Sequence, residues 1–165
     1  MYKPYLIVVT GRAGSGKTTL AKNLSNDFYM PLISRDQIKE GYVHTLGKKH
    51  TELPQESNRI TTEIFFDTLK SLLINNVSLI AEAAFQHNVW ESKLEQFKDM
   101  AQIYFLICKI EDKIAFERFI ERGKNNTLRG YFHGDKGVEM AKKGIKVEAG
   151  LYEEPRLDLP IFYIY

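Results

Sequence analysis

Eight consecutive residues near the start of the chain have the types and spacing of a phosphate-binding loop. The segment Gly11–Thr18 reads Gly-Arg-Ala-Gly-Ser-Gly-Lys-Thr and lies between an apolar run and a segment with helical periodicity. Its glycines allow a tight turn whose N–H groups can point at phosphate oxygens. Lys17 supplies a compact positive charge for the β- and γ-phosphates, and Thr18 offers a hydroxyl to Mg²⁺. In this strand–loop–helix context, the pattern predicts binding of a nucleoside triphosphate, ATP in the first instance.

The nucleotide contacts are expected from the loop and from the first turn of the helix that follows it. That helix adds unpaired N–H donors and the positive end of its dipole. The alternative, a Gly-rich turn without a ligand, leaves Lys17 and Thr18 unexplained. The residues expected to hold the nucleotide here are Gly11, Ala13, Gly14, Ser15, Gly16, Lys17, Thr18 and Thr19.

Length and composition bound the remaining possibilities. The 165 residues predict one domain, residues 1–165, able to bury about two-thirds of its unfolded surface. Cys108 is the only cysteine, which excludes an internal disulfide, and its apolar surroundings favour a buried thiol. The N-terminus enters an apolar run at once and no run is long enough to cross a membrane, so a cytoplasmic protein without a membrane partner is expected.

Charge is unevenly distributed along the chain. The overall net charge is +2, but residues 118–146 hold eight basic and three acidic side chains, a net +5, and the remainder therefore carries −3. The overall value is too small to imply a nucleic-acid partner by itself. The four histidines show no metal-ligand spacing, which argues against a structural zinc site.

Short apolar runs alternate with helical patterns along the whole chain. Strands separated by helices predict a three-layer α/β/α sandwich around a five-stranded parallel sheet. Right-handed crossovers would bring the ligand loops together at the carboxyl ends of the strands. The expected strands are 5–10, 31–34, 77–82, 102–109 and 157–164, and the expected helices are 17–27, 35–46, 56–75, 89–98 and 111–123. Residues 47–55 are expected to form a loop, 123–137 a mobile loop, and 138–152 a weak helix.

Asp36 follows the second expected strand and is a candidate general base. Opposite the γ-phosphate, its carboxylate could accept the proton of a substrate hydroxyl and orient the attacking oxygen. The alternative is a helix N-cap, a common role for aspartate. Both roles can hold together.

Glu82 closes the third expected strand and is a candidate magnesium ligand, through water, together with Thr18. Nucleotide-binding proteins of this kind usually place an aspartate there, one methylene shorter. The alternative is a charged residue where the strand meets solvent.

Two arginines bracket the flexible basic segment and are candidates for a closing lid. Arg122 and Arg129 could stack on a purine ring and bind phosphates in a fork geometry. Lid closure would expel water and protect ATP from hydrolysis. The alternative is a solvated basic face. Residues 85–90 could line a substrate pocket, although Trp90 is more readily explained by packing, and Arg59 could bind an anionic substrate or lie free on the surface.

Taken together, these motifs resemble the small P-loop kinases of the nucleoside-monophosphate-kinase-like fold. The group includes shikimate and gluconate kinases, chloramphenicol phosphotransferase, the polynucleotide 5′-kinase domain, and many kinases labelled "AAA domain". Residues 33–39 look like the motif in which the aspartate matching Asp36 is the general base. Residues 122–129 are similar to the shikimate-kinase lid, which implies that Arg122 stacks on adenine and that Arg129 reaches the phosphates. The resemblance also implies strand order 2-3-1-4-5.

The sequence departs from that group in three places. The lid lacks the usual Arg-His-Pro ending, Glu82 replaces aspartate, and the chain stops at Tyr165, where an adenine-flanking loop would begin. The leading hypothesis is therefore a Mg²⁺-dependent kinase that phosphorylates a hydroxyl of a small molecule, with Lys17, Asp36 and Arg129 in catalytic roles. One alternative is a nucleotide or polynucleotide 5′-hydroxyl kinase. Another is an ATP-binding regulatory module or an NTPase without an acceptor.

Overall fold

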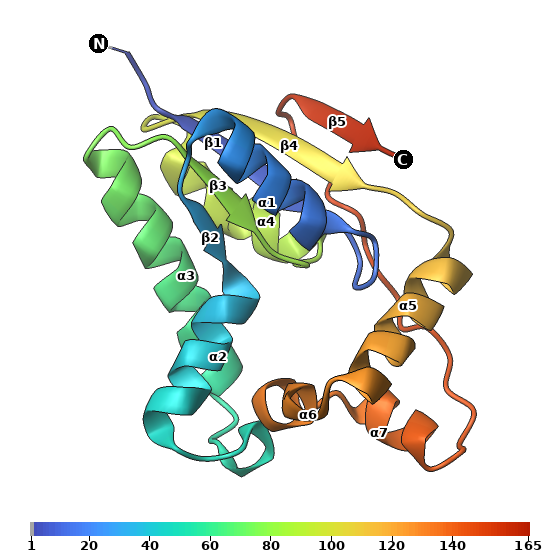
Figure 1. Ribbon diagram of the computed structural model, residues 1–165. Helices are drawn as coiled ribbons and strands as arrows, with labels where there is room; N and C mark the ends of the chain where they lie inside the picture. The colour runs from blue at the N-terminus through green and yellow to red at the C-terminus, as the bar shows by residue number, and fades with distance from the viewer. Residues whose placement is uncertain (1) are drawn as a thin grey trace.

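The computed structural model describes residues 2–165, and a parallel sheet of five strands forms its centre (Figure 1). The strand order is β2-β3-β1-β4-β5, and every neighbouring pair is parallel. This confirms the predicted fold class and strand order. The strands are β1 Tyr5–Thr10, β2 Leu32–Ser34, β3 Leu79–Glu82, β4 Gln102–Cys108 and β5 Ile161–Ile164.

Helices cover both faces of the sheet, as expected for strands that are buried on both sides. In Figure 1, α1 crosses the near face, whereas α4 lies behind the sheet. The helices are α1 Lys17–Phe28, α2 Arg35–Leu46, α3 Ser57–Ile74, α4 His87–Leu94, α5 Asp112–Asn125, α6 Thr127–His133 and α7 Lys136–Lys142. Two short 3₁₀ turns, His50–Glu52 and Glu95–Phe97, follow α2 and α4.

Two apolar clusters hold these layers together. The larger joins the sheet to α3 and α4, and it contains a set of aromatic rings in edge contacts around the fully buried Trp90. The smaller joins the sheet to α1 through residues such as Val9 and Ala21. Phe85 and Trp90 belong to the larger cluster, so packing, rather than substrate contact, explains them.

The segment predicted to be a mobile loop is instead largely helical. Helix α5 continues past Gly123 to Asn125. A Cβ at position 123 would lie only 2.5 Å from a Val138 methyl, so the glycine lets Val138 of α7 pack against α5. Asn126 then caps α6, and its Oδ1 accepts hydrogen bonds from the N–H groups of Leu128 and Arg129. The predicted loop at 123–137 and the predicted helix end at Gly123 are therefore both wrong.

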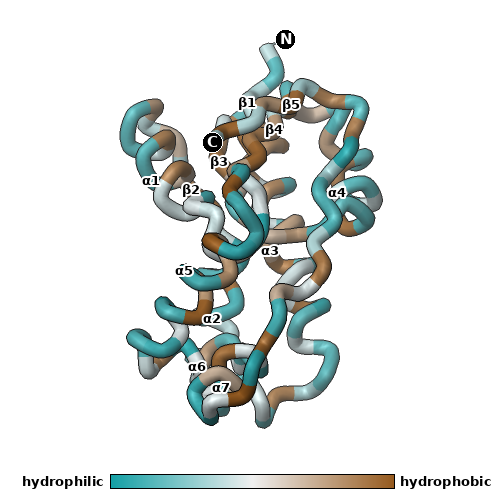
Figure 2. The backbone as a smooth tube through the Cα atoms, turned by 90° about the vertical axis from the view of Figure 1, so that its right-hand side faces the viewer, coloured by the Kyte–Doolittle hydropathy of each residue, from teal (hydrophilic) through white to brown (hydrophobic). Residues whose placement is uncertain are grey.

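The chain returns from α7 to β5 through an irregular linker, residues 143–160 (Figure 2). In that view the linker runs along the molecule, with α5 on one side and α4 on the other. The predicted helix at 138–152 is confirmed only as far as Lys142, and the last strand begins at Ile161 rather than at 157. Among residues 2–165, no helix is both long enough and apolar enough to span a bilayer.

Candidate active site

The phosphate-binding loop joins β1 to α1, and two of its glycines are required both by conformation and by space. Gly11 and Gly14 have φ angles of 142° and 85°, values that residues with a side chain rarely adopt. A Cβ at Gly11 would lie 2.7 Å from the Cys108 carbonyl oxygen, and one at Gly14 would lie 2.0 Å from the Ala115 carbonyl oxygen. Gly16 also has a positive φ, 91°, but its Cβ would meet nothing within 4 Å. The loop is thus pressed against β4 and α5.

The loop and the first turn of α1 leave groups available for a phosphate. Gly16 occupies the cap position of α1, and within residues 2–165 no side chain caps that end. The hydroxyl of Ser15 is buried and has no hydrogen-bond partner among the described residues. Unpaired donors at a helix N-terminus, with the positive end of the dipole, favour an anion. These features fit the predicted phosphate contacts.

Lys17, Thr18 and Glu82 meet at the carboxyl ends of the central strands. Lys17 Nζ lies 3.9 Å from Glu82 Oε1, and Thr18 Oγ1 donates a hydrogen bond of 3.2 Å to the same oxygen. Strand register places Ser34 beside Glu82, and its hydroxyl donates to Oε2 at 2.6 Å. Burial lowers the pKa of Lys17, and the carboxylates of Glu82 and Asp36 oppose that shift.

Glu82 is 3% exposed, so the alternative of a charged residue at the solvent boundary is wrong. Its carboxylate and the Thr18 hydroxyl are hard oxygen donors, the kind that Mg²⁺ prefers. Among the described residues there is no cluster of three or more His, Cys, Asp or Glu side chains that could hold a metal. A magnesium ion here would accordingly depend on these two residues together with water and phosphate oxygens.

Asp36 lies in the first turn of α2, directly after β2. Helix α2 begins at Arg35 and its cap position is Ser34, so the N-cap interpretation of Asp36 is wrong. The Asp36 side chain is 51% exposed and lies 3.9 Å from Arg35 Nη1, which leaves its carboxylate open to a substrate. Its charge acts on Lys17 and on Arg122, whose pKa values it raises against the opposing effect of burial.

Arg35 lies beside Asp36 and donates hydrogen bonds to α3. Its Nη2 donates to the carbonyl and side-chain oxygens of Asn58 and to the Thr61 hydroxyl, at 3.3–3.4 Å. The Arg35 Nε is buried without a partner within residues 2–165. Burial lowers the pKa of this guanidinium, and the Asp36 carboxylate opposes the shift. By contrast, Arg59, the other candidate for an anionic substrate, is exposed.

The two lid arginines differ in their surroundings. Arg129 is 14% exposed, its Nε lies 2.7 Å from Asp135 Oδ2, and its guanidinium lies 5.5 Å from the centre of the Phe119 ring. Arg122, at the end of α5, is exposed; partial desolvation and the neighbouring Arg129 lower its pKa. Arg129 is therefore part of a packed cluster rather than a solvated basic face.

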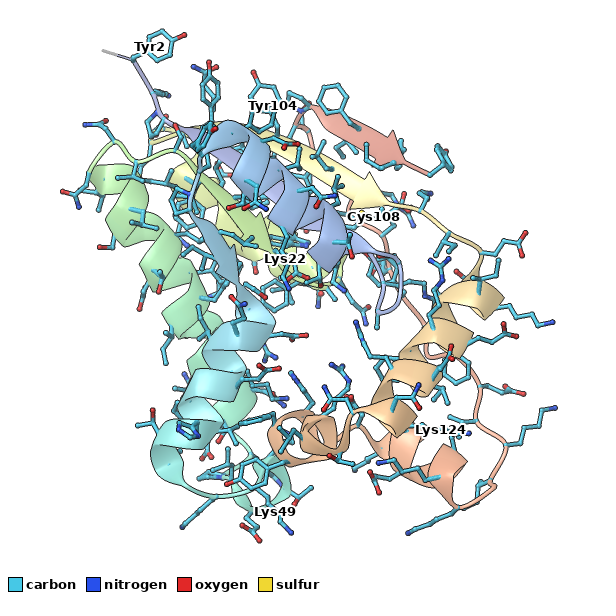
Figure 3. The ribbon with its side chains drawn as sticks, in the orientation of Figure 1. Tyr2, Lys22, Lys49, Tyr104, Cys108 and Lys124 are labelled. Carbon is cyan, nitrogen blue, oxygen red and sulfur yellow. The ribbon has the colours of Figure 1, made fainter. Side chains whose placement is uncertain are left out.

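Helix α6 contacts α2 and closes the side of the site away from the sheet. His133 Nε2 lies 2.8 Å from Glu40 Oε1, and Lys39 Nζ donates to the His133 carbonyl oxygen at 3.5 Å. Figure 3 shows side chains of α2, α5 and α6 pointing toward one another between these helices, whereas Lys49 lies on the outer side. Lys39 is only 7% exposed, and burial, with the nearby Arg35, lowers its pKa to about 8.

Several of these residues could not be assigned a role from sequence alone. Lys39 had one local signal, its position three residues after Asp36, which places both on neighbouring turns of one helix. The pairing of Arg129 with Asp135, of Glu82 with Ser34, and of His133 with α2 had none. Arg12 is another example: it pairs with Asp112 and donates to the Gly150 carbonyl at 2.9 Å, far along the chain.

With this geometry in place, comparison with known proteins identifies the family. The profile of a family described as "AAA domain" matches residues 6–136. The chain belongs to this family. The match includes the phosphate loop, Asp36, Glu82, Arg122 and Arg129, but not the linker or β5.

Two curated relatives are similar in sequence over part of their length. Cytidylate kinase of Bartonella henselae is 29% identical over 79 residues, which are 47% of this chain and 37% of that protein. A UPF0200 protein of Sulfurisphaera tokodaii is 28% identical over 125 residues, 74% of this chain and 70% of that protein. The match thus spans little more than a third of the cytidylate kinase.

Solved structures with the same fold include several kinases. A protein of Chloroflexus aurantiacus described as a candidate kinase aligns with a TM-score of 0.78 at 22% identity, over 99% of this chain and 86% of that one. A gluconokinase of Sinorhizobium meliloti aligns at 0.58 and 15%, over 99% and 83%. A chain of the Pnkp1/Rnl/Hen1 RNA repair complex aligns at 0.65 and 15%, over 93% and 50%. These likenesses establish the P-loop kinase fold.

Proposed function

We propose that the chain is an ATP-dependent phosphotransferase that transfers the γ-phosphoryl group of ATP to a hydroxyl of a small-molecule acceptor. The observation that carries this proposal is the presence of two groups at the carboxyl ends of the strands. On one side Lys17, Thr18 and Glu82 form a buried cluster at the phosphate loop. On the other side the Asp36 carboxylate is half exposed and electrostatically coupled to Lys17. A plain ATP-binding module has no need of the second site.

The donor side would hold the triphosphate and its metal. The N–H groups of Gly14–Thr18 and the Lys17 ammonium bind the β- and γ-phosphates. Thr18 and, through water, Glu82 would hold Mg²⁺, and the ion would neutralise the charge that develops on the transferred group. Arg122 contacts the adenine, and the lid around residues 123–137 keeps water from the γ-phosphate. Residues 1–165 act as one kinase domain.

The acceptor side would supply the base. Asp36 takes the proton of the acceptor hydroxyl while the oxygen bonds to the γ-phosphorus, the bridging P–O bond breaks and ADP leaves. Arg129 stabilises the transferring group, either after it leaves Asp135 or while it is still paired with that residue. Its contact with Phe119 holds the guanidinium against α5 rather than in solvent.

A second candidate is a nucleotide or polynucleotide 5′-hydroxyl kinase. The buried cations Arg35 and Lys39 flank Asp36, where they could accept a phosphate group of the acceptor. The partial similarity to a protein named cytidylate kinase supports this class as well. Binding of oligonucleotides with a steep salt dependence would favour it over a small neutral acceptor.

The test is phosphoryl transfer from γ-labelled Mg-ATP to a panel of hydroxyl compounds, with Lys17→Met as the inactive control. We expect at least one labelled product with the natural chain and none with the control. If Mg-ATP binds tightly and no acceptor is labelled, the kinase proposal fails. Rapid acceptor-independent hydrolysis would then indicate an NTPase, and slow hydrolysis a regulatory module.

A further inference from the structure

A cavity of about 270 Å³ adjoins the phosphate loop on the side covered by the linker. Ala13 of the loop, Gln86 after β3, Phe116 and Phe119 of α5, and linker residues including Tyr152 line it. Because Ala13 belongs to the loop itself, a ligand seated there has one end beside the triphosphate. Phe119 also lies under the Arg129 guanidinium, so one wall of the cavity is continuous with the proposed transfer site.

The walls of this cavity are mostly apolar and its charge is already neutralised. Phe116 and Phe119 supply the apolar surface, and Leu151 lies at the exposed rim. The one guanidinium in the wall, Arg12, is paired with Asp112 and donates to the Gly150 carbonyl. An anionic ligand would find no free cation among the residues that line the cavity, and a cationic ligand would find no carboxylate.

The polar groups of the wall differ in how accessible they are. The Tyr152 hydroxyl is buried and lies beside Thr10; burial raises the pKa of Tyr152 to about 12, and the Thr10 side chain opposes that shift. The Thr10 hydroxyl also donates to the Ala83 carbonyl and accepts from Trp90 Nε1. The Tyr152 hydroxyl is thus held inside the fold, and Gln86, which is exposed, is the polar side chain of the lining that a ligand can reach.

We propose that this cavity is the acceptor subsite and that it selects a compact, uncharged alcohol with a largely apolar body. The inference rests on the proposed function and names its substrate class. A cavity of about 150 Å³ accommodates benzene, so 270 Å³ suits a body of roughly ten non-hydrogen atoms by the same scale. Phe116 and Phe119 pack on that body, Gln86 orients it by a hydrogen bond, and Ala13 places the end that carries the hydroxyl beside the phosphate loop.

The linker also connects this subsite to the donor side. Arg12, a residue of the phosphate loop, holds Gly150 of the cavity wall. The His87 N–H donates to the Glu153 carbonyl, and the Arg156 N–H donates to His87 Nδ1, at 3.0 and 3.2 Å. These three contacts tie the linker to the phosphate loop and to α4, while Ala149, Gly150 and Leu151 at the rim of the cavity stay exposed to solvent.

The test uses a filled cavity and a matched control in the same linker. Ala149 lines the cavity, and Ala149→Phe would fill it; exposed Lys146 is outside the lining, and Lys146→Phe adds the same ring elsewhere. The probes are 2-phenylethanol, D-gluconate and an oligonucleotide with a 5′-hydroxyl. Binding is measured by saturation-transfer NMR in the presence of a non-hydrolysable Mg-ATP analogue, and transfer is measured with γ-labelled ATP.

We expect 2-phenylethanol to bind the natural chain and Lys146→Phe equally, and at least tenfold more weakly to Ala149→Phe, while the Kd of Mg-ATP changes less than twofold. Where transfer is seen, KM should rise in Ala149→Phe with little change in kcat. Failure of 2-phenylethanol to bind, or equal binding to Ala149→Phe, overturns the subsite. Transfer to D-gluconate or to the oligonucleotide that Ala149→Phe leaves unchanged also overturns it, but leaves the kinase proposal intact. A kinase failure shows differently, as Mg-ATP binding without transfer to any probe.

Discussion

The phosphate loop and the lid are built in contrasting ways. In the loop, eight contiguous residues are expected to bind the phosphates, and close approaches to β4 and α5 constrain their path. In the lid, Arg129 pairs with Asp135 and lies over the Phe119 ring, and His133 pairs with Glu40. The backbone conformation of the loop glycines is fixed by the fold, whereas a side-chain pairing can open and close. The proposed donor site is thus preformed, and the proposed acceptor side depends on contacts between distant segments.

In the phosphate loop, substitution of Lys17 should have the largest effect on phosphoryl transfer. Lys17→Met removes the buried ammonium 3.9 Å from Glu82 and leaves that carboxylate without its cation. We expect phosphoryl transfer to fall by about 10²–10³-fold or more, the loss typical of one electrostatic donor to a transition state. Mg-ATP affinity should fall as well, which calorimetry would show. Transfer within a few-fold of the natural chain would remove Lys17 from the catalytic group.

Within the loop, two glycines separate conformational strain from steric conflict. Gly16→Ala meets only the strain of a positive φ, about 1–3 kcal/mol. Gly14→Ala adds a clash with the Ala115 carbonyl, an overpacking term of about 1–3 kcal/mol more. Urea unfolding should therefore rank Gly14→Ala as the less stable variant. Equal free energies of unfolding would show that α5 moves away from the loop without penalty.

The contact between α2 and the lid helix α6 can be tested through the buried Lys39. The pKa of Lys39 is about 8 in the folded protein, against an ordinary value of 10.5. Between pH 8 and pH 10.5, therefore, Lys39 is neutral in the folded chain but still protonated in the unfolded chain. Stability contributed by this group therefore rises with pH across that window. Lys39→Met should be more stable than the natural chain at pH 7, by about 1–3 kcal/mol.

The advantage of Lys39→Met should shrink as the pH rises from about 8 toward 10, because the natural lysine becomes neutral as well. The measurement is the difference in the free energy of unfolding between the two chains at several pH values, which cancels the titration of other groups. Lys39→Arg, which retains the charge, is the matched control. A difference that does not change with pH would mean that Lys39 is not desolvated at the α2–α6 contact.

Much of the fold was predictable because its signals are local. Apolar runs bounded by Gly, Pro and Asn marked the strands, and Gly11–Thr18 marked the loop whatever followed it. The lid was predicted as a loop because glycines usually interrupt helices. In the structure Gly123 and Gly130 lie inside helices, and of these lid glycines only Gly134, with φ 59°, ends one. Asn126 was a readable cap signal.

The partners of the site residues had no such signal. Lys39 is buried by a helix more than ninety residues away, as the contact with His133 shows. The same holds for Tyr152, which approaches Thr10 only because the linker returns across the loop. Tertiary packing decides these burial states, and neither periodicity nor spacing encodes it locally.

The most direct test of the central claim is single-turnover transfer by Asp36→Asn. This substitution keeps the shape of the side chain and removes its charge and basicity, and Asp67→Asn, at an exposed position of α3, is the matched control. With an acceptor that the natural chain phosphorylates, we predict a rate about 10²–10⁴-fold lower, with the Kd of Mg-ATP unchanged and Asp67→Asn unaffected. A rate within threefold of the natural chain would contradict the account, because the acceptor side would then lack its base.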